Sequence, residues 1–493
     1  MFNPKPVRPP LTSKSICKIN VFKHIDNVTN ESLLSLATPI EMFNMHNEGG
    51  VLRSGLGVEK ARITTGNGLG FFMLPTYTGD DVISQLFVYP KYDKVNNKED
   101  NLLLARTSSG NFYKTSLSKP KDVWTRIGTF NYTEKAKAIY YCYDGKEVML
   151  FCSKANKLSI YDGDTISFVN NAPKISSMCE HYGRIFASVY GEGKEIWFSD
   201  SYDPNNWSVS LTEAGYIKFS DALGKAIKVI SFNDYLYVFR EHAIFRLTAF
   251  GDQTKFEINK VAEINGNIYE DSIILCKDRI VFLCYDGLYV FDGFNIKKVG
   301  KNIKKLENIR ENYITADYAN GHYYLSFYYE YNGSYHDETG LYLNNALLDF
   351  DIEKNQIEFS RGMNIIDLVN VKINNTSTCY VAANGIMPKN VGMLTYNGKY
   401  YNTELKSAFC SVKYYFKENC RSKVIRDIRI YSLYNCILTL IADGVEYKYN
   451  ITGLNIYQNI KVNRKCKWLQ LKIEAEGKVE IKGIELDVEM VRR

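Results

Sequence analysis

Short runs of apolar and aromatic residues, paired across tight turns, dominate the middle of the sequence and predict β-hairpins. Between residues 100 and 400 there are seven such pairs, and the helical spacing of apolar positions is nearly absent. The pairs begin at Leu102, Val148, Ile185, Leu236, Ile280, Tyr323 and Cys379, and so recur about every 46 residues. That interval is typical of one four-stranded blade of a β-propeller. The pattern therefore predicts a propeller of six or seven blades.

Two twelve-residue segments in this region match each other in register. Leu158–Val169 and Leu288–Val299 share a leucine, a β-branched residue, an aromatic residue, Asp-Gly, Ile and Val at corresponding positions. The segments lie 130 residues apart, which is close to three of the intervals described above. Asp-Gly supplies the positive φ that a tight hairpin turn requires. We therefore expect equivalent hairpins three blades apart.

The last part of the chain has a different pattern. Apolar residues alternate strictly with polar and charged ones at Ile428/Ile430, Leu438/Leu440, Leu469/Leu471/Ile473 and Ile484/Leu486/Val488. Alternation of this kind is typical of strands that have one buried and one solvated face. The length and the spacing of these strands predict a small β-sandwich.

The first 60 residues lack the hairpin pattern. Pro4, Pro6, Pro9 and Pro10 stand among cations, and such a segment becomes ordered mainly by docking on another surface. A short helix is expected at Glu31–Ala37. The prediction is an all-β protein in three parts: an extended N-terminal arm (residues 1–60), a six- or seven-bladed β-propeller (61–400) and a C-terminal β-sandwich (401–493).

Composition agrees with this prediction and excludes several classes of protein. The 493 residues include 38 Tyr and 26 Phe, which favour pleated surfaces. The net charge of +6 does not mark a dedicated nucleic-acid binder. Apolar runs are far shorter than the ~20 residues of a membrane helix, and the N-terminus lacks the apolar core of an export signal. Eleven scattered cysteines without CxxC spacing predict free thiols in a protein that is assembled in the cytosol.

Motifs for catalysis or cofactor binding are missing from the sequence. The six histidines have no metal-ligand spacing, and there is no Gly-x-Ser-x-Gly elbow, Walker loop or His-Glu-x-x-His. Ser199–Trp207 superficially resembles the Asp box of sialidase blades, but its glycine is missing and its tryptophan comes one position early. Asp boxes are in any case structural turns. We therefore expect no enzymatic activity, no cofactor and no metal.

Three motifs, in a fixed order, carry a resemblance to a group of bacteriophage proteins. They are the loop Gly50–Leu56, the stretch Glu195–Trp207 (EIWFSDSYDPNNW), and a C-terminal region that begins KVIRDIRI at Lys423, continues with Asp443-Gly444 and ends with IKGIELD. Together with the propeller-like middle, they resemble the tail hub, nozzle and packaged-DNA stabilisation proteins of short-tailed phages and their crAss-like relatives. The resemblance covers most of the chain.

The resemblance implies a structural role in the virion tail. Members of this group form rings, commonly six-fold, at the end of the head-to-tail connector, where they extend the DNA channel, help to retain packaged DNA and carry fibres or a plug. The partners implied are further copies of the chain in a ring, expected to be a hexamer, portal or adaptor proteins, and tail fibre or plug proteins. Contact with phage DNA would be transient and non-specific. The protein would not insert into a membrane, and it would be assembled in the host cytoplasm. Identical rigid wedges can pack around such a ring, and a near-balanced charge lets DNA slide.

Two sets of residues are candidates for contacts. The possible DNA-channel cations are Arg53, Lys60, Arg62, Lys297, Lys298, Lys301, Lys304 and Lys305; those from Lys297 onward also fit a solvated face. The possible interface aromatics, expected on exposed loops, are Tyr328, Tyr329, Tyr331 and Tyr335. Tyrosines can also stack on sugars. A receptor- or glycan-binding propeller, as in a phage adhesin or a bacterial surface protein, is therefore the alternative function.

Overall fold

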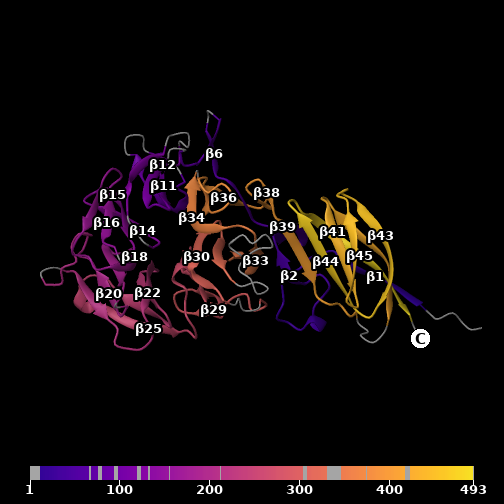
Figure 1. The fold of residues 1–493 in the computed structure, drawn as a ribbon. Coiled ribbons are helices and arrows are strands. Elements are labelled where there is room, and N and C mark those ends of the chain that lie inside the picture. The colour runs from indigo at the N-terminus through magenta and orange to yellow at the C-terminus, as the bar shows by residue number, and fades with distance from the viewer. Residues whose placement is uncertain are drawn as a thin grey trace, which may run out of the picture.

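The computed structural model consists of β-strands, with no α-helix among the residues that it describes. In Figure 1 the strands form a large array of small sheets and, beside it, two larger sheets, which we call the C-terminal unit. The all-β prediction is confirmed. The residues described are 12–65, 68–75, 80–93, 98–118, 124–130, 134–154, 156–191, 193–210, 213–303, 308–329, 346–373, 375–416 and 422–491.

The array contains seven sheets that follow one another along the described chain (Figure 1). Six of them have four antiparallel strands in sequence order. They are β8 (Ile83–Tyr89), β11 (Leu102–Thr107), β12 (Asn111–Ser116) and β13 (Thr125–Thr129); β14 (Lys137–Tyr143), β15 (Lys146–Cys152), β16 (Leu158–Tyr161) and β17 (Ile166–Val169); β18 (Ile175–His181), β19 (Arg184–Val189), β20 (Glu195–Phe198) and β21 (Gly215–Lys218); β22 (Ala226–Phe232), β23 (Tyr235–Arg240), β24 (Ala243–Thr248) and β25 (Glu257–Glu263); β26 (Ile274–Cys276), β27 (Arg279–Cys284), β28 (Gly287–Phe291) and β29 (Ile296–Lys298); and β30 (Arg310–Ala319), β31 (His322–Tyr328), β32 (Ala346–Asp351) and β33 (Gln356–Ser360).

A strand from the N-terminal region completes the seventh sheet. This sheet contains β34 (Ile365–Ile373), β35 (Thr376–Ala383), β36 (Gly392–Thr395), β5 (Gly57–Lys60), β37 (Lys399–Tyr400) and β38 (Thr403–Glu404). Strand β5 pairs antiparallel with β36, with Gly57 opposite Thr395. The chain segment that precedes the first sheet is thereby hydrogen-bonded into the last one.

Hydrophobic contacts also close the array. Each pair of consecutive sheets encloses its own cluster of buried side chains, and one cluster joins the last sheet to the first through Val371 and Tyr380 on one side and Leu86 and Leu103 on the other. Strand β34 of the last sheet also contacts β8 of the first. The arrangement is propeller-like, because a ring of sheets leaves no large open edge between its ends.

The hairpins predicted from the sequence match the second and third strands of the seven sheets. The second strand expected after Tyr323 falls largely outside the described residues, and β32 begins at Ala346. The two matching segments form β16–β17 and β28–β29, at equivalent places in sheets three apart. In both turns the aspartate carboxylate, Asp162 or Asp292, accepts backbone N–H bonds from residues two and three positions later. The glycine that follows has φ of 100° at Gly163 and 99° at Gly293, which explains the shared Asp-Gly.

The C-terminal unit consists of two sheets around one hydrophobic core. The first sheet contains β3 (Met45–Glu48), β4 (Val51–Ser54), β45 (Glu480–Val491), β40 (Lys423–Ser432) and β43 (Tyr457–Cys466), with β1 (Thr12–Ile19) also paired to β45. The second contains β2 (Pro39–Phe43), β39 (Lys406–Ser411), β44 (Leu469–Glu476), β41 (Cys436–Ala442) and β42 (Val445–Ile451). The alternating residues predicted from the sequence, such as Ile428, Leu440 and Leu471, fill this core and are fully buried.

Two expectations for the N-terminal region are wrong. Residues 12–60 do not form a separate arm, because β1 to β4 pair within the C-terminal unit and β5 pairs within the array. The helix expected at Glu31–Ala37 is a single 3-10 turn, η1 (Glu31–Leu33), and the chain is extended again at Leu34. Proline disfavours helical φ/ψ in the residue that precedes it, and here Thr38 precedes Pro39 at the start of β2. Other 3-10 turns are η3 (Gln253–Lys255) and η4 (Glu270–Ser272), and two-stranded ribbons are β6 (Arg62–Thr65) with β7 (Gly68–Phe71) and β9 (Tyr92–Asp93) with β10 (Lys98–Glu99).

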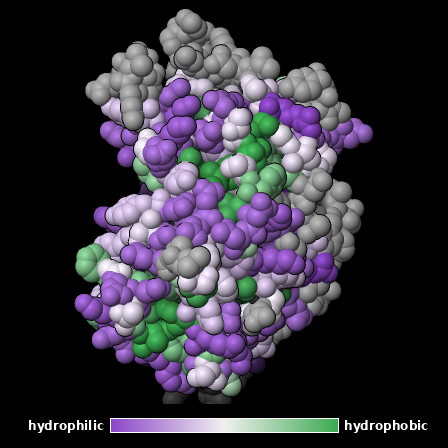
Figure 2. Space-filling view, turned by 90° about the vertical axis from the view of Figure 1, so that its left-hand side faces the viewer, coloured by the Kyte–Doolittle hydropathy of each residue, from purple (hydrophilic) through white to green (hydrophobic). Residues whose placement is uncertain are grey.

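The surface of the array that points away from the C-terminal unit is mostly hydrophilic. In Figure 2 hydrophobic side chains on this face form separate groups and no continuous patch. Among the described residues, no helix has the length and apolar character that a membrane span requires. The ten cysteines in the described ranges are free thiols.

Candidate functional site

The first strands of all seven sheets line a cavity of about 530 Å³ in the middle of the array. Polar and charged side chains from different sheets meet here, including Gln85 of β8, Lys137 of β14, Ser177 of β18, Lys228 of β22 and Asp367 of β34. Side chains alternate along a strand, so successive residues such as Val229 and Ile230 of β22 pack against the two neighbouring sheets, and the outer edge of each first strand borders this cavity. The cavity is therefore the place where the largest number of sheets contribute side chains to one site.

Two lysines of this cavity are held by backbone carbonyls. Lys135 Nζ, just before β14, donates to the carbonyl of Ile314 in β30 at 2.8 Å, and Lys228 Nζ donates to the carbonyl of Ile273 at 2.7 Å. Burial lowers the pKa of Lys135 to about 8 and that of Lys228 to about 7, because removal from bulk water disfavours the ammonium form. The sheets that Lys135 joins are not neighbours, so this side chain reaches across the cavity.

Carboxylates also line the cavity and balance the positive charge of its lysines. Lys137 forms ion pairs with Asp271 and, at 3.5 Å, with Glu270 on the far side of the cavity. The carboxylate of Asp367 is satisfied by the backbone N–H of β8 at 2.8 Å and by a threonine hydroxyl of β30 at 3.1 Å. Burial raises the pKa of Asp367, and raises that of Asp317 to about 6. The arrangement braces opposite sheets through charged side chains that reach across the cavity.

A second cavity, of about 1080 Å³, lies between the array and the C-terminal unit. The N-terminal residues His24 and His46 line one side of it, and Asp349 and Glu358 of the sixth sheet line the other. We call the contacts around this cavity the joint, because they hold the two parts of the molecule together.

Asn44 forms three side-chain hydrogen bonds at the joint. Its side-chain amide donates to the carbonyls of Arg361, at 3.1 Å, and Lys406, at 2.7 Å, and its side-chain oxygen accepts the backbone N–H of Arg361 at 2.7 Å. Asn44 is buried, with φ of 55°, a left-handed conformation that asparagine tolerates better than most residues. One side chain therefore connects the end of β2, the segment after β33 and the start of β39.

Titratable groups gather at the joint. Glu358 accepts the backbone N–H of Asn47 at 2.9 Å, and burial raises its pKa to about 8, with the nearby charge of Asp349 adding to the shift. Asp349 forms a hydrogen bond with Nδ1 of His322 at 2.7 Å and accepts a hydrogen bond from the hydroxyl of Tyr396 at 2.6 Å. Burial would lower the pKa of His322, but the bond to Asp349 raises it overall.

The structure does not bring the predicted DNA-channel cations into one group. Arg53 lies in β4 of the C-terminal unit, where it pairs with Glu48. Lys60 and Arg62 lie in β5 and β6 of the array, and Arg62 Nη2 is 3.6 Å from a carboxylate oxygen of Glu59. Two of these three cations are thus paired with acids.

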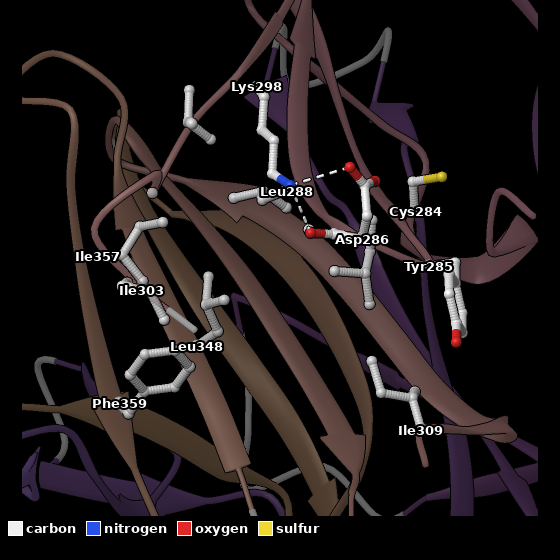
Figure 3. A pocket seen from close by; sticks show the side chains of 14 residues that line it. Cys284, Tyr285, Asp286, Leu288, Lys298, Ile303, Ile309, Leu348, Ile357 and Phe359 are labelled. Carbon is white, nitrogen blue, oxygen red and sulfur yellow. Dashed lines mark hydrogen bonds and ion pairs between the residues drawn. The ribbon is translucent and has the colours of Figure 1, made fainter. Parts of the chain in front are cut away.

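One residue of the second group of predicted cations, Lys298, lines a small pocket between the fifth and sixth sheets. Lys298 points into the mouth of this pocket, where its ammonium donates to the carboxylate of Asp286 at 2.9 Å and to its carbonyl at 2.6 Å (Figure 3). Apolar side chains such as Ile357 line the other side (Figure 3). Lys297 and Lys301 are exposed, as a solvated face requires. Outside the described residues lie Lys304 and Lys305.

The predicted interface tyrosines are not exposed where the structure describes them. Tyr328 is buried at the end of β31, and its hydroxyl donates to Asn364 Oδ1 at 2.6 Å. Tyr329 is half-buried against the cluster between the fifth and sixth sheets. The expectation of exposure is wrong for these two residues, because both pack inward from the strand end. Tyr331 and Tyr335 lie outside the described residues.

A different aromatic group is exposed on the array. Tyr182, Tyr202 and Phe250 come from turns of the third and fourth sheets, and 44%, 72% and 67% of their surfaces are exposed. The rings of Tyr182 and Phe250 meet edge-on, 5.0 Å apart, and the hydroxyl of Tyr182 donates to Asp234 at 3.3 Å. Sequence reasoning missed this group, because three turns that are distant in sequence bring it together.

Comparisons with known proteins yield little for this chain. The scan against protein-family models and the search of curated proteins find no match. Among solved structures, the mercury-soaked crystal structure of BBS1N in complex with ARL6DN is similar over 62% of this chain and 90% of that chain. Its TM-score is 0.39 and its sequence identity is 7%. No family is shown for the chain.

Proposed function

We propose that this protein is a structural subunit of a bacteriophage tail, a hub or nozzle ring protein below the portal and adaptor. In this role it extends the DNA channel, helps to retain packaged DNA and docks fibres or a plug. The seven sheets of the array are then the blades of a seven-bladed β-propeller closed by β5, and the two sheets of the C-terminal unit form a β-sandwich. The proposal rests on the resemblance of three ordered sequence motifs to such proteins.

The joint is the observation that best supports this role. A ring under the pressure of packaged DNA needs subunits whose two parts do not swing relative to each other. Asn44 connects three chain segments at the joint, and Glu358 accepts a bond from Asn47. The interleaved N-terminal strands add backbone pairing in both parts. The molecule is therefore suited to act as one rigid wedge in a closed ring.

The cavity in the middle of the array bears on where DNA would pass in such a ring. Lys135 and Lys137 cross this cavity and bond to other sheets, so the array of one subunit does not provide a path for a duplex. A DNA channel would then lie on the axis between subunits. The surfaces that matter for DNA are consequently on the outside of each subunit.

Electron microscopy of the purified chain and of the virion tests the proposal. We expect closed rings of uniform size, with six-fold symmetry as the first expectation, and the same ring on the tail axis. Mass photometry of the same sample should give one oligomer whose mass is a multiple of 56.6 kDa. A monomer in solution together with a peripheral position on the virion, or a trimeric spike, would contradict the proposal.

The exposed aromatic group supports one alternative function, a glycan-binding module. Aromatic rings present flat apolar faces on which sugar rings can stack, and Asp234 beside Tyr182 could accept bonds from sugar hydroxyls. Binding to a glycan array that is lost in Tyr202→Ala, but retained in the matched variant Tyr216→Ala at another exposed position, would favour this alternative. Absence of binding by the native chain would remove it.

A further inference from the structure

Strand β43 and the turn after it carry exposed cations at the outer edge of the C-terminal unit. The four residues, which we call the basic edge, are Lys461, Arg464, Lys465 and Lys467, and all are exposed. β43 is the last strand of its sheet, and Figure 1 shows it on the side of the unit that points away from the array. The basic edge is therefore open to a large partner.

These cations form no ion pair among the described residues. No carboxylate of the described residues lies within 4 Å of the charged nitrogens of the basic edge. By contrast, Arg53, Arg62 and Lys298, which the sequence had suggested, all have acidic partners. The cations of the basic edge are therefore available to an anion from outside, although Lys461 lies opposite Asp427 in the ladder.

The exposed cations of β43 project from both faces of this edge strand. In the pairing with β40, Arg464 lies opposite Ile425 and Lys461 lies opposite Asp427, so the register shifts between them and β43 has a bulge there. Arg464 and Lys465 follow the bulge in regular register, and successive side chains of a strand point to opposite faces. Both are exposed because β43 is the last strand of its sheet.

Two further features accompany these exposed cations. Lys423 is completely buried beneath the edge, where its ammonium donates to the carbonyls of Tyr415 at 2.8 Å and Lys467 at 3.2 Å. The guanidinium of Arg464 lies over the ring of Tyr447, 4.5 Å from its centre. An aromatic ring beside exposed cations is a common composition of surfaces that contact nucleic acids.

We propose that the basic edge binds the phosphate backbone of double-stranded DNA without regard to its sequence. A cluster of exposed lysines and arginines suits binding to a phosphate backbone, because affinity for DNA comes mainly from protein cations that replace the counterions of the phosphates. Base recognition would need side chains inserted in a groove, and lysines along a strand edge contact phosphates instead. The inference extends the proposed function, because it names the surface that faces DNA in a ring.

A simpler role for these lysines is protection of the strand edge. Charged residues and bulges on edge strands prevent pairing with other chains. The two roles can be separated by charge reversal, since Lys461→Glu/Lys465→Glu keeps charges on the edge but removes the attraction for phosphate. The double variant should stay monodisperse under either role, and only DNA binding should change.

Fluorescence anisotropy with a labelled DNA duplex of arbitrary sequence tests the proposal. We expect Lys461→Glu/Lys465→Glu to weaken binding at least tenfold and to reduce the slope of log K against log salt by about 2. The matched control is Lys297→Glu/Lys301→Glu, two exposed lysines of the array, which should bind as the native chain does. Equal affinities of the two double variants, or binding of native chain to anionic phospholipid vesicles but not to DNA, would overturn the inference.

The same variants separate this inference from the proposed function. Rings seen by electron microscopy without DNA binding would remove the basic edge as a DNA site and leave the tail role intact. DNA binding through the basic edge by a chain that never forms rings would uphold the inference and remove the ring.

Discussion

Asn44 and Arg361, 317 residues apart in sequence, exchange two hydrogen bonds at the joint. The asparagine amide donates to the carbonyl of Arg361, and its side-chain oxygen accepts the N–H of the same residue. The pair resembles two residues of an antiparallel ladder, although one partner is a side chain. It fixes the C-terminal unit on the sixth and seventh sheets of the array.

Replacing Asn44 should lower the free energy of unfolding by more than the strain of its left-handed backbone conformation alone would cost. Asn44→Ala removes three hydrogen bonds in a buried place, and it puts alanine at positive φ, for a total cost of about 3–4 kcal/mol. The control is Asn320→Ala, an exposed turn residue with the same φ of 55°, which should cost only about 1 kcal/mol. Calorimetric melting of both variants checks this. If the two variants melt alike, the amide bonds of Asn44 contribute nothing to stability.

Glu358 should make the protein less stable as pH rises. Its folded pKa of about 8 lies above the unfolded value, so the folded chain binds more protons between about pH 4.5 and 8, and stability falls across this window. Glu358→Gln keeps the bond from Asn47 and removes the titration. At ~1.4 kcal/mol per pKa unit, the variant should gain roughly 3–4 kcal/mol over native chain between pH 5 and pH 8.

Denaturant unfolding at several pH values measures this difference. The neighbouring groups titrate in both proteins, so their contributions cancel when the two curves are subtracted. If the free energies of unfolding of Glu358→Gln and the native chain change with pH in parallel, this carboxyl titrates normally in the folded state.

Lys228 should have the opposite dependence on pH. Its folded pKa of about 7 lies below the unfolded value, so the folded chain binds fewer protons above pH 7, and stability rises with pH toward about 10. Lys228→Met removes the buried ammonium and should be more stable than the native chain at pH 6, by roughly 2–4 kcal/mol, with the difference narrowing toward pH 10. Thermal melting at these pH values, with exposed Lys301→Met as control, checks this. A variant that is less stable at pH 6 would mean that the bond to Ile273 outweighs the cost of burial.

Strand β5 should be important for closing the array. Val58 is completely buried between β36 and β37, so Val58→Ala should cost about 2 kcal/mol. Val445→Ala in β42, where 54% of the valine is exposed, is the matched control and should change little. Hydrogen exchange should show faster opening of both β5 and β36 in Val58→Ala. Equal exchange in the two variants would mean that β5 is not needed for closure.

The parts of the fold that depend on local chemistry could be predicted from the sequence. The turns at Asp162 and Asp292 need only a carboxylate and a glycine at fixed spacing, and both were found. The placement of residues 12–60 could not be predicted, because the partners of β1 lie more than 400 residues later. Nothing near Thr12–Ile19 in sequence signals those partners.

Side-chain environments were predicted less well than strands. Tyr328 stands beside a polar stretch of sequence and was expected to be exposed, but it is the last residue of β31 and its ring is buried. Lys228 could have attracted attention as a lysine within an apolar strand. The basic edge depends on the position of β43 at the edge of its sheet, and its lack of ion pairs is a property of the folded chain alone.

The pairing of β1 and β4 with β45 has a consequence for synthesis on the ribosome. Strand β4 pairs with β45, and β1 pairs along β45 as well, so the first strands made wait for the last one. At roughly 5–20 residues per second, this delay is on the order of 20–90 s. During that time the N-terminal strands expose edges that invite wrong pairing, and chaperones that cover them would raise the yield. A chain released before β45 is made cannot complete the C-terminal unit, so truncated copies would lack the core that the two sheets of this unit share.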